Sequence, residues 1–185
     1  MTQRYDTYKE SGVQWLGEIP GLWESIKLKA FCKENKEKNK GNAESCVLSL
    51  SYLVIHQMDA FAGSSGVSDS DGMGTPVLSV CTSKIEGLNM YYFAHILRLM
   101  GKNNFILSLY RGIRERSSDF RFETFAKQYL PVPPKLEQEK IVSYHDDKCS
   151  KIDLLVEKLK AEIDAIKEYK QRLISDVVTG QIKVC

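Results

Sequence analysis

The sequence predicts an α+β fold, with one compact domain of mixed strands and helices followed by a single long C-terminal helix. Up to Pro134 the chain alternates short apolar runs with glycine and proline turns. After Pro134 it becomes charged and periodic, and no glycine or proline follows until Gly180. We therefore expect a domain over residues 1–133, a helix over 134–180 and a short tail over 181–185.

Composition describes an ordinary globular chain. Its 185 residues are 43% hydrophobic, which is enough to build a core. A net charge of +2 gives no global basic field, so a nucleic-acid surface would need local clusters of lysine and arginine. The five cysteines lack metal-site spacing and predict reduced thiols; they are Cys32, Cys46, Cys81, Cys149 and Cys185. With no signal peptide and no spanning run, we expect a cytoplasmic protein without a membrane partner.

The first 31 residues predict turns and short strands. Apolar side chains there gather around Gly17, Pro20 and Gly21. The bulk of Trp15 and Trp23 favours core packing over a base-stacking or ligand role. The next segment, KENKEKNKGN from Lys33 to Asn42, has alternating charge, which is most often typical of a solvated loop or helix end.

The middle of the chain predicts both strands and a helix. VLSLSYLVI and VLSVCTS are apolar runs of strand length, separated by the turn-rich GSSGVSDSDGMGTP. NMYYFAHILRLM has helical spacing after Asn89, a residue that can cap a helix. GIRERSSDFRF predicts a basic loop, and FETFAKQYL a short element that ends at Pro131. The domain is therefore predicted to mix α and β structure.

The C-terminal segment predicts one long helix with a narrow apolar stripe. Prolines suit its start and Gly180 its end. Continuous helix from Leu136 to Thr179 would span about 65 Å. The stripe recurs at steps of three and four; it contains Ile152, Leu155, Leu159, Ile163, Ile166, Tyr169, Leu173 and Val177. Either the chain's own domain or a partner chain would bury this stripe, and its length favours a partner.

Patterns that mark common catalytic sites are missing from the sequence. GSSGVSDSDG lacks the lysine and hydroxyl residue of a phosphate-binding loop. The D-S-D-G segment resembles part of a calcium loop, but Leu78 stands where its bidentate carboxylate belongs. His56, His95 and His145 are spaced as ordinary helix or strand histidines. The sequence thus favours binding over catalysis, with no catalytic residue, metal site or cofactor.

Three segments resemble the specificity (S) subunit of type I restriction-modification systems. They are YKESGVQWLGEIPGLWE near the start, HQMDAFAGSSGVSDSDG in the middle, and LPVPPKLEQEKIVSYHDDKCSKIDLLVEKLKAEIDAIKEYKQRLISDVVTG at the end. Together they cover most of the chain. The P-P-x-x-E-Q-E-K-I helix start, followed by KIDLL and RLISDVVTG, is the most specific part of this resemblance.

The resemblance implies a non-catalytic DNA-recognition subunit. In that family a target recognition domain reads one half of a split double-stranded DNA site. A long helix spaces it from a second such domain and docks the methyltransferase (M) subunits of a complex that also contains the endonuclease and translocase (R) subunit. A usual S subunit has two domains and two helical regions, whereas this chain has one of each. It therefore resembles a half-size or truncated S subunit whose helix pairs antiparallel with that of a second S chain, as a homodimer or with another S subunit.

The resemblance also suggests which residues meet each partner. We expect phosphate contacts at Lys33, Lys36, Lys38 and Lys40, and base or phosphate contacts at Arg111, Arg114, Arg116 and Arg121. We expect the antiparallel coiled coil to form through Ile152, Leu155, Leu159, Ile163, Ile166, Leu173 and Val177.

One stretch departs from the family pattern. In that family a few tens of residues separate the counterparts of VLSL and VIHQMDAFAGSSGVS, whereas SLSYLVIHQ runs straight through here. The recognition domain is therefore expected to be shortened near residues 52–54. This keeps open a second hypothesis, a degenerate S fragment that acts only as a helix-mediated interaction protein and reads no DNA.

Overall fold

The computed structural model describes residues 4–13, 15–41, 44–109 and 121–184. The chain forms two compact units, residues 1–142 and 143–185. The first unit contains every named strand and the first two turns of the long helix α5 (Lys135–Val178). Among the described residues, no helix combines the length and the apolar content needed to cross a bilayer.

The N-terminal residues form the short strands that the sequence predicts. Strand β1 (Tyr8–Glu10) pairs antiparallel with β2 (Glu18–Pro20). Strand β3 (Glu24–Lys27) pairs antiparallel with β10 (Tyr129–Val132), about one hundred residues further along the chain. Trp15 and Trp23 are half-buried against the core, which confirms their predicted packing role.

A four-stranded antiparallel sheet follows, in the order β4-β9-β6-β7. Its strands are β4 (Cys32–Glu34), β9 (Leu78–Ser83), β6 (Leu53–His56) and β7 (Ser65–Val67). Leu53 and Ile55 of β6 are fully buried, whereas Val54 and His56 between and after them are only half-buried. One face of the sheet therefore packs on the core and the other is more open.

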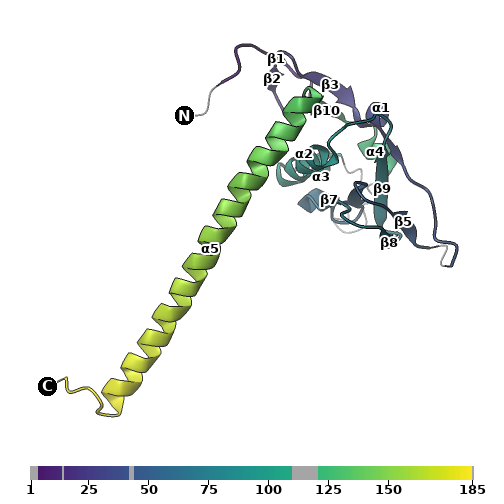
Figure 1. Cartoon of the computed structure of the whole chain (residues 1–185). Coiled ribbons are helices and arrows are strands. Elements are labelled where there is room, and N and C mark those ends of the chain that lie inside the picture. The colour runs from purple at the N-terminus through teal and green to yellow at the C-terminus, as the bar shows by residue number, and fades with distance from the viewer. Residues whose placement is uncertain (1–3, 14, 42–43, 110–120, 185) are drawn as a thin grey trace. The chain divides into compact units, whose positions relative to one another are not determined.

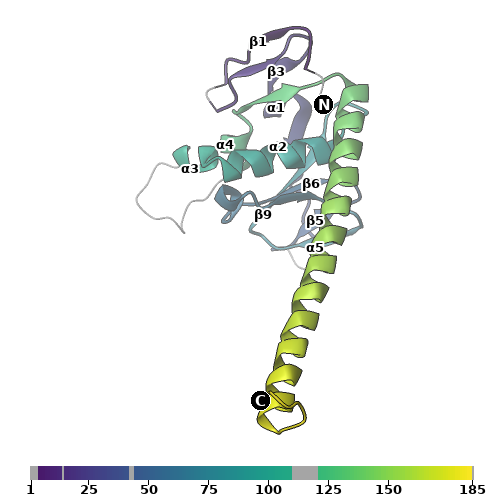
Figure 2. The ribbon, with the colours of Figure 1, turned by 90° about the vertical axis from the view of Figure 1, so that its left-hand side faces the viewer.

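Helix α2 (Met90–Lys102) lies between this sheet and the β3–β10 pair (Figures 1 and 2). Phe93 of α2 packs on Phe31 with ring centroids 4.5 Å apart. The Tyr92 hydroxyl donates to the Pro131 carbonyl at 3.1 Å. The remaining short helices are α1 (Leu28–Phe31), the 3₁₀ turn η1 (Ala60–Ala62), α3 (Phe105–Ser108) and α4 (Phe122–Phe125).

One local prediction was wrong because tertiary pairing overrides local sequence. The element expected to end at Pro131 is α4 followed by β10, and β10 continues through Pro131 to Val132. Proline fits there because β10 pairs with β3 alone, in a two-stranded sheet. The segment that starts at Lys33, expected as loop or helix end, is mostly loop up to Gly41, although it begins in β4 and forms a β-bridge between Lys38 and Cys46.

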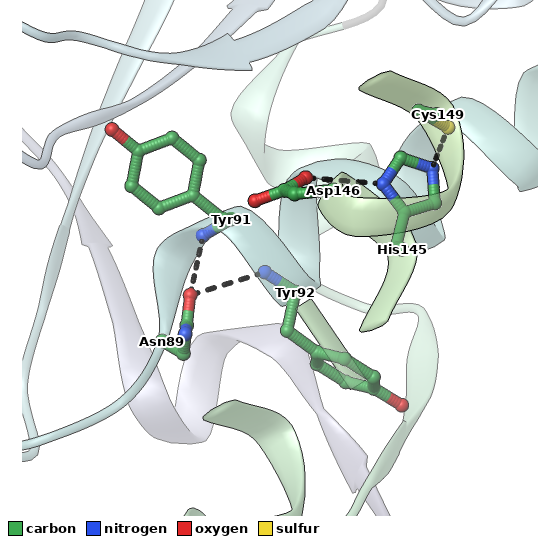
Figure 3. A network of polar contacts seen from close by, with 6 residues as sticks. All are labelled: Asn89, Tyr91, Tyr92, His145, Asp146 and Cys149. Atoms are coloured by element: carbon green, nitrogen blue, oxygen red, sulfur yellow. Dashed lines mark hydrogen bonds and ion pairs between the residues drawn. The ribbon is translucent and has the colours of Figure 1, made fainter. Parts of the chain in front are cut away.

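Helix α2 begins at the predicted cap. The Asn89 side chain accepts hydrogen bonds from the amides of Tyr91 and Tyr92, at 3.0 and 3.4 Å (Figure 3). These bonds satisfy two of the amides that a helix start leaves without partners. The amide of Asn89 itself donates to the side-chain oxygen of Gln138, at 3.1 Å.

Gln138 joins this cap to the start of α5. Its side chain is 1% exposed. Its oxygen accepts from the Asn89 amide, and its Nε2 donates to the Pro133 carbonyl at 2.9 Å. A buried amide with both ends bonded stabilises a fold, whereas the loss of either bond leaves a buried polar group unpaired. Gln138 thereby fixes the β10–α5 connection against α2.

Glu137, the residue before Gln138, connects the N-terminal segment to the start of α5. Its carboxylate accepts from the Trp23 indole at 3.1 Å and from the Tyr5 hydroxyl. Burial and the hydrogen bond to Glu137 raise the pKa of Tyr5 to about 12. The indole edge of Trp23 also meets the rings of Tyr5 and Tyr92. The first and the last segments of unit 1 therefore meet at one turn of helix.

We predict that Gln138→Leu lowers the free energy of unfolding by about 1–3 kcal/mol, because the Asn89 amide and the Pro133 carbonyl stay buried without partners. Urea denaturation of the full chain measures this change. The matched control is Gln171→Leu, at an exposed position of α5. Equal effects of the two substitutions would show that Gln138 does not join the two elements.

We also predict that stability falls as the pH rises above about 9. Burial raises the pKa of Cys32 from 9.0 to about 12 and raises that of Cys81 in the same direction. Below pH 9 both the folded and unfolded states hold these protons, and at higher pH only the folded state does, so stability is lost as the pH rises. Urea denaturation at pH 7.5, 9 and 10 under reducing conditions measures the slope.

Cys32→Ala should make that pH slope shallower. The control is Ser79→Ala, in strand β9. The Ser79 side chain is fully buried and accepts a hydrogen bond from Gln57 Nε2 at 3.1 Å, but its hydroxyl does not titrate in this pH range. An unchanged slope in Cys32→Ala would contradict the prediction.

Candidate nucleic-acid interface and pairing helix

A small ribbon of extended chain carries the predicted lysines. Strand β5 (Cys46–Leu48) pairs antiparallel with β8 (Gly72–Gly74). On the other side of β5, the Val47 amide donates to the Glu37 carbonyl at 3.1 Å, and the Asn39 amide to the Ser45 carbonyl at 3.0 Å. We call residues 36–40, β5 and β8 the basic ribbon. It lies at the end of unit 1 away from the β1–β2 hairpin (Figure 1).

The ribbon presents its lysines outward. Lys36, Lys38 and Lys40 are all exposed, and their spacing of two residues in extended chain favours one shared face. Asn39 lies between Lys38 and Lys40, and its side-chain amide donates to the sulfur of Met73 on β8. Lys33, on β4, is exposed opposite the buried Cys32. Three of the four predicted lysines therefore lie exposed on the basic ribbon, and Lys33 lies outside it.

These lysines are suited to contacts with phosphates. Lys36 has a nearby carboxylate oxygen, on Glu34 at 3.7 Å, and its side chain is 82% exposed. An exposed ion pair of this kind contributes little stability, so exchanging it for a phosphate costs little. A flexible ammonium group contacts phosphate as a point charge and without base specificity.

The predicted arginine group is placed only in part. Arg111, Arg114 and Arg116 lie outside the described residues. Arg121 is exposed and immediately precedes α4. The structure therefore brings Lys36, Lys38 and Lys40 together on one ribbon and leaves the spatial relation of the arginines to this ribbon as a prediction.

The predicted stripe of α5 is exposed along most of its length. The side chains of Ile152, Leu155, Leu159, Ile163, Ile166 and Leu173 are between 40% and 66% exposed, and Val177 is half-buried. The helix carries further apolar side chains outside the predicted stripe. Leu154, Val156 and Ile174 are exposed as well. Neighbouring residues in a helix lie about 100° apart, so these side chains widen the apolar surface beyond the predicted stripe.

The polar surface of α5 carries local ion pairs. Lys151 lies 2.7 Å from Asp147, and Lys167 lies 3.0 Å from Asp164. The hydrogen bond from Lys151 lowers the pKa of the Asp147 carboxyl. Pairs at spacings of three and four give an exposed helix a few tenths of a kcal/mol each (~0.2–0.5). They help the helix stay formed where apolar packing is missing.

A cysteine, a histidine and an aspartate follow one another along the surface of α5. Cys149 Sγ lies 3.5 Å from His145 Nε2, and His145 Nδ1 lies 3.2 Å from Asp146 (Figure 3). Amides inside an α-helix are bonded to carbonyls four residues earlier, so they offer no donors for a developing oxyanion. This series is a helix-surface contact, and His145 is the helix histidine that the sequence predicts.

The fold of this chain is shared with solved structures of type I restriction-modification proteins. No family model and no curated protein matches the chain. A solved structure of a type I R-M system, described in terms of its complex assembly and conformational transition, matches with a TM-score of 0.64 over 91% of this chain at 16% identity. The HsdS subunit from Thermoanaerobacter tengcongensis matches with a TM-score of 0.56 over 80% of this chain at 14% identity. The chain has the HsdS fold.

This likeness confirms the predicted fold class and the resemblance to type I S subunits. A match over 91% of the chain must include most of the domain and part of the long helix. The chain covers 48% of the first neighbour and 41% of the HsdS subunit, so it spans about half the length of each. At these identities the likeness shows the fold alone.

Proposed function

We propose that the chain is a DNA-recognition subunit of a type I restriction-modification complex. Its domain reads one half of a bipartite double-stranded DNA site, and its helix pairs with a second S chain and docks the M subunits. The observation that carries the proposal is the HsdS-like fold across both parts of the chain. In this role the chain binds and positions, and the catalytic steps belong to its M and R partners.

The helix supplies the spacing in this proposal. Forty-four residues of uninterrupted helix span about 66 Å, and no proline or glycine interrupts it. Antiparallel pairing of two such helices through their exposed apolar stripes would hold two readers a fixed distance apart. Identical readers would then prefer an inverted repeat with a nonspecific spacer. A second, different S subunit would give an asymmetric bipartite site.

The basic ribbon supplies affinity in this proposal. Lysines on phosphates account for sequence-independent binding, with a salt dependence set by the number of phosphates that they neutralise. Base choice would come from other side chains, including the proposed contacts of Arg111, Arg114, Arg116 and Arg121. An arginine fork suits guanine edges and phosphates alike.

One observation favours a second function, helix-mediated association without DNA reading. Strands β5 and β6 are joined by the tight turn Ser49–Tyr52, in which the Tyr52 amide donates to the Ser49 carbonyl at 3.1 Å. Ser51 has a φ of 66°, a left-handed conformation that a residue with a side chain adopts at a cost. The turn lies where the family resemblance implies a few tens of additional residues. A recognition loop lost there would leave the helix as the functional part.

Selection of bound DNA from a random duplex pool separates the two functions. The full chain, with its M subunit at physiological salt, should enrich a split sequence. Stable complex formation without enrichment would favour the interaction protein instead. Absence of DNA binding by that complex would contradict the proposed DNA-recognition role.

The lysines have a separate test in the same complex. Lys36→Gln combined with Lys38→Gln should reduce the slope of log affinity against log salt by about 1.8, or about 0.9 for each phosphate that is no longer neutralised. The control Lys9→Gln changes an exposed lysine of β1, at the other end of unit 1. An unchanged slope in the double variant would remove the ribbon from the DNA interface.

We predict that Leu159→Asp disrupts pairing of α5. Burying one leucine stabilises a structure by about 1.5–3 kcal/mol, and a symmetric dimer loses two, so the dissociation constant should rise at least about 100-fold. Sedimentation equilibrium of the full chain measures this constant. Ala161→Asp is the matched control, since it adds the same charge at an exposed position about 200° around the helix. Equal effects of both substitutions, or a monomeric wild-type chain, would contradict pairing of two copies through the stripe.

A further inference from the structure

The open face of the central sheet carries a hollow of about 470 Å³ beside its edge strand β7. Apolar side chains line part of it, from Leu48, Val54 and Leu78. Residues Gly63 to Ser68 and the side of Arg98 line the rest. The same GSSGVS segment belongs to the middle motif of the sequence resemblance, and the proposed function assigns it no role.

Gly66 opens the hollow. It pairs with Val54, and the neighbouring Ser65 turns its hydroxyl to the Ala94 carbonyl of α2 at 3.1 Å. Side chains alternate along a strand, so Gly66 stands on the opposite, open face. A Cβ at Gly66 would lie 3.7 Å from Arg98 Nη2 and would meet no other atom within 4 Å. The missing side chain therefore leaves free space directly beside a guanidinium group.

Arg98 is held in a fixed orientation at this place. Its Nε donates to the Ser65 carbonyl at 2.8 Å, which anchors the guanidinium plane at the edge of β7. Gly63, with a φ of 79°, brings its backbone so close to α2 that a Cβ would lie 2.8 Å from the Arg98 carbonyl. Close packing of this loop on the helix fixes the turn of α2 that carries Arg98.

The guanidinium group has donors left over. Within the described parts of the chain, neither Nη nitrogen of Arg98 has a protein acceptor, and the residues that line the hollow include no carboxylate. His56, also in the lining, turns its Nδ1 to Asp59, 3.1 Å from the carboxylate. Arg98 therefore contributes an uncompensated positive charge with two nitrogens able to donate together to one anion.

The hollow adjoins the basic ribbon. Leu48, which lines it, is the last residue of β5, and β5 pairs with the segment that carries Lys36 and Lys38. A nucleic-acid strand following the lysines along the ribbon would thus reach Arg98 next. This continuity favours a phosphate in a chain of phosphates over a free anion.

We propose that the hollow between β7 and Arg98 is a binding site for a backbone phosphate of DNA. The Nη groups of Arg98 donate to two phosphate oxygens, while its Nε keeps the bond to Ser65. The open space at Gly66 admits the phosphate. The inference rests on the proposed DNA-recognition function and adds to it a positioning contact outside the lysine and arginine groups that the sequence suggests.

Two substitutions test the site in the full chain complexed with its M subunit. Arg98→Gln removes the charge, and Gly66→Val fills the hollow while net charge is kept and a β-branched residue suits the strand. Both should weaken binding to a labelled duplex about tenfold and reduce the salt slope by about 0.9. Lys102→Gln, at an exposed position of the same helix outside the hollow, is the matched control and should leave both values nearly unchanged.

The reduced salt slope in Gly66→Val is the decisive result, because that substitution changes no charge. If Arg98→Gln unfolds the chain, Gly66→Val alone tests the phosphate site. If the wild-type complex binds DNA and both variants bind it with the same affinity and salt slope, the phosphate site is refuted and the proposed function stands. No DNA binding by the wild-type complex would instead refute the proposed function, and this inference with it.

A second measurement distinguishes a free anion from the DNA backbone. Inorganic phosphate added to the isotope-labelled full chain should shift the amide signals of Gly66 and Ser68 in the wild type but not in Arg98→Gln. Such shifts together with unchanged DNA binding by the variants would assign the hollow to a free phosphate and overturn the DNA contact.

Discussion

The buried side chain of Gln138 is the polar link on which the arrangement of helix α2 and the start of α5 depends. Its two hydrogen bonds join the cap of α2 to the strand-to-helix connection after β10. An unpaired amide at this depth is costly, so both elements must keep their places for either bond to form. Helix α2 in turn packs on the central sheet and carries Arg98 to the edge of β7. The position of the proposed phosphate site therefore depends, through α2, on this amide.

Segments distant in the sequence meet beside Gln138. Glu137 binds Trp23 from the first segment of the resemblance and Tyr5, which lies three residues before that segment. Glu137 and Gln138 belong to the last segment. The rings of Tyr5 and Tyr92 each meet the ring of Trp23, whose indole donates to the Glu137 carboxylate. Sequence stretches that look like separate motifs thus form one joint, which anchors the first two turns of α5 in the domain.

The two proposed binding surfaces have opposite mechanical needs, and the fold provides for each. A reader of DNA needs exposed, extended chain that can follow a phosphate backbone, and the basic ribbon and the edge of β7 supply it. A spacer needs stiffness, which uninterrupted helix and ion pairs on its surface supply. The exposed apolar stripe is unfavourable in water, so the proposed pairing would gain stability by covering it.

The features that the sequence alone determined are helix starts and ends, which depend on residues close together in the chain. The period of three and four residues, the prolines before Lys135 and Gly180 after Val178 predicted α5, and Asn89 predicted the start of α2. Such signals act within a few residues, so they can be read without the rest of the chain. Only the tertiary structure decided that Pro131 lies within β10, that residues 36–40 join the basic ribbon, and that Arg98 reaches Gly66. Those features depend on pairings between residues far apart in the chain, whose partners no local pattern specifies.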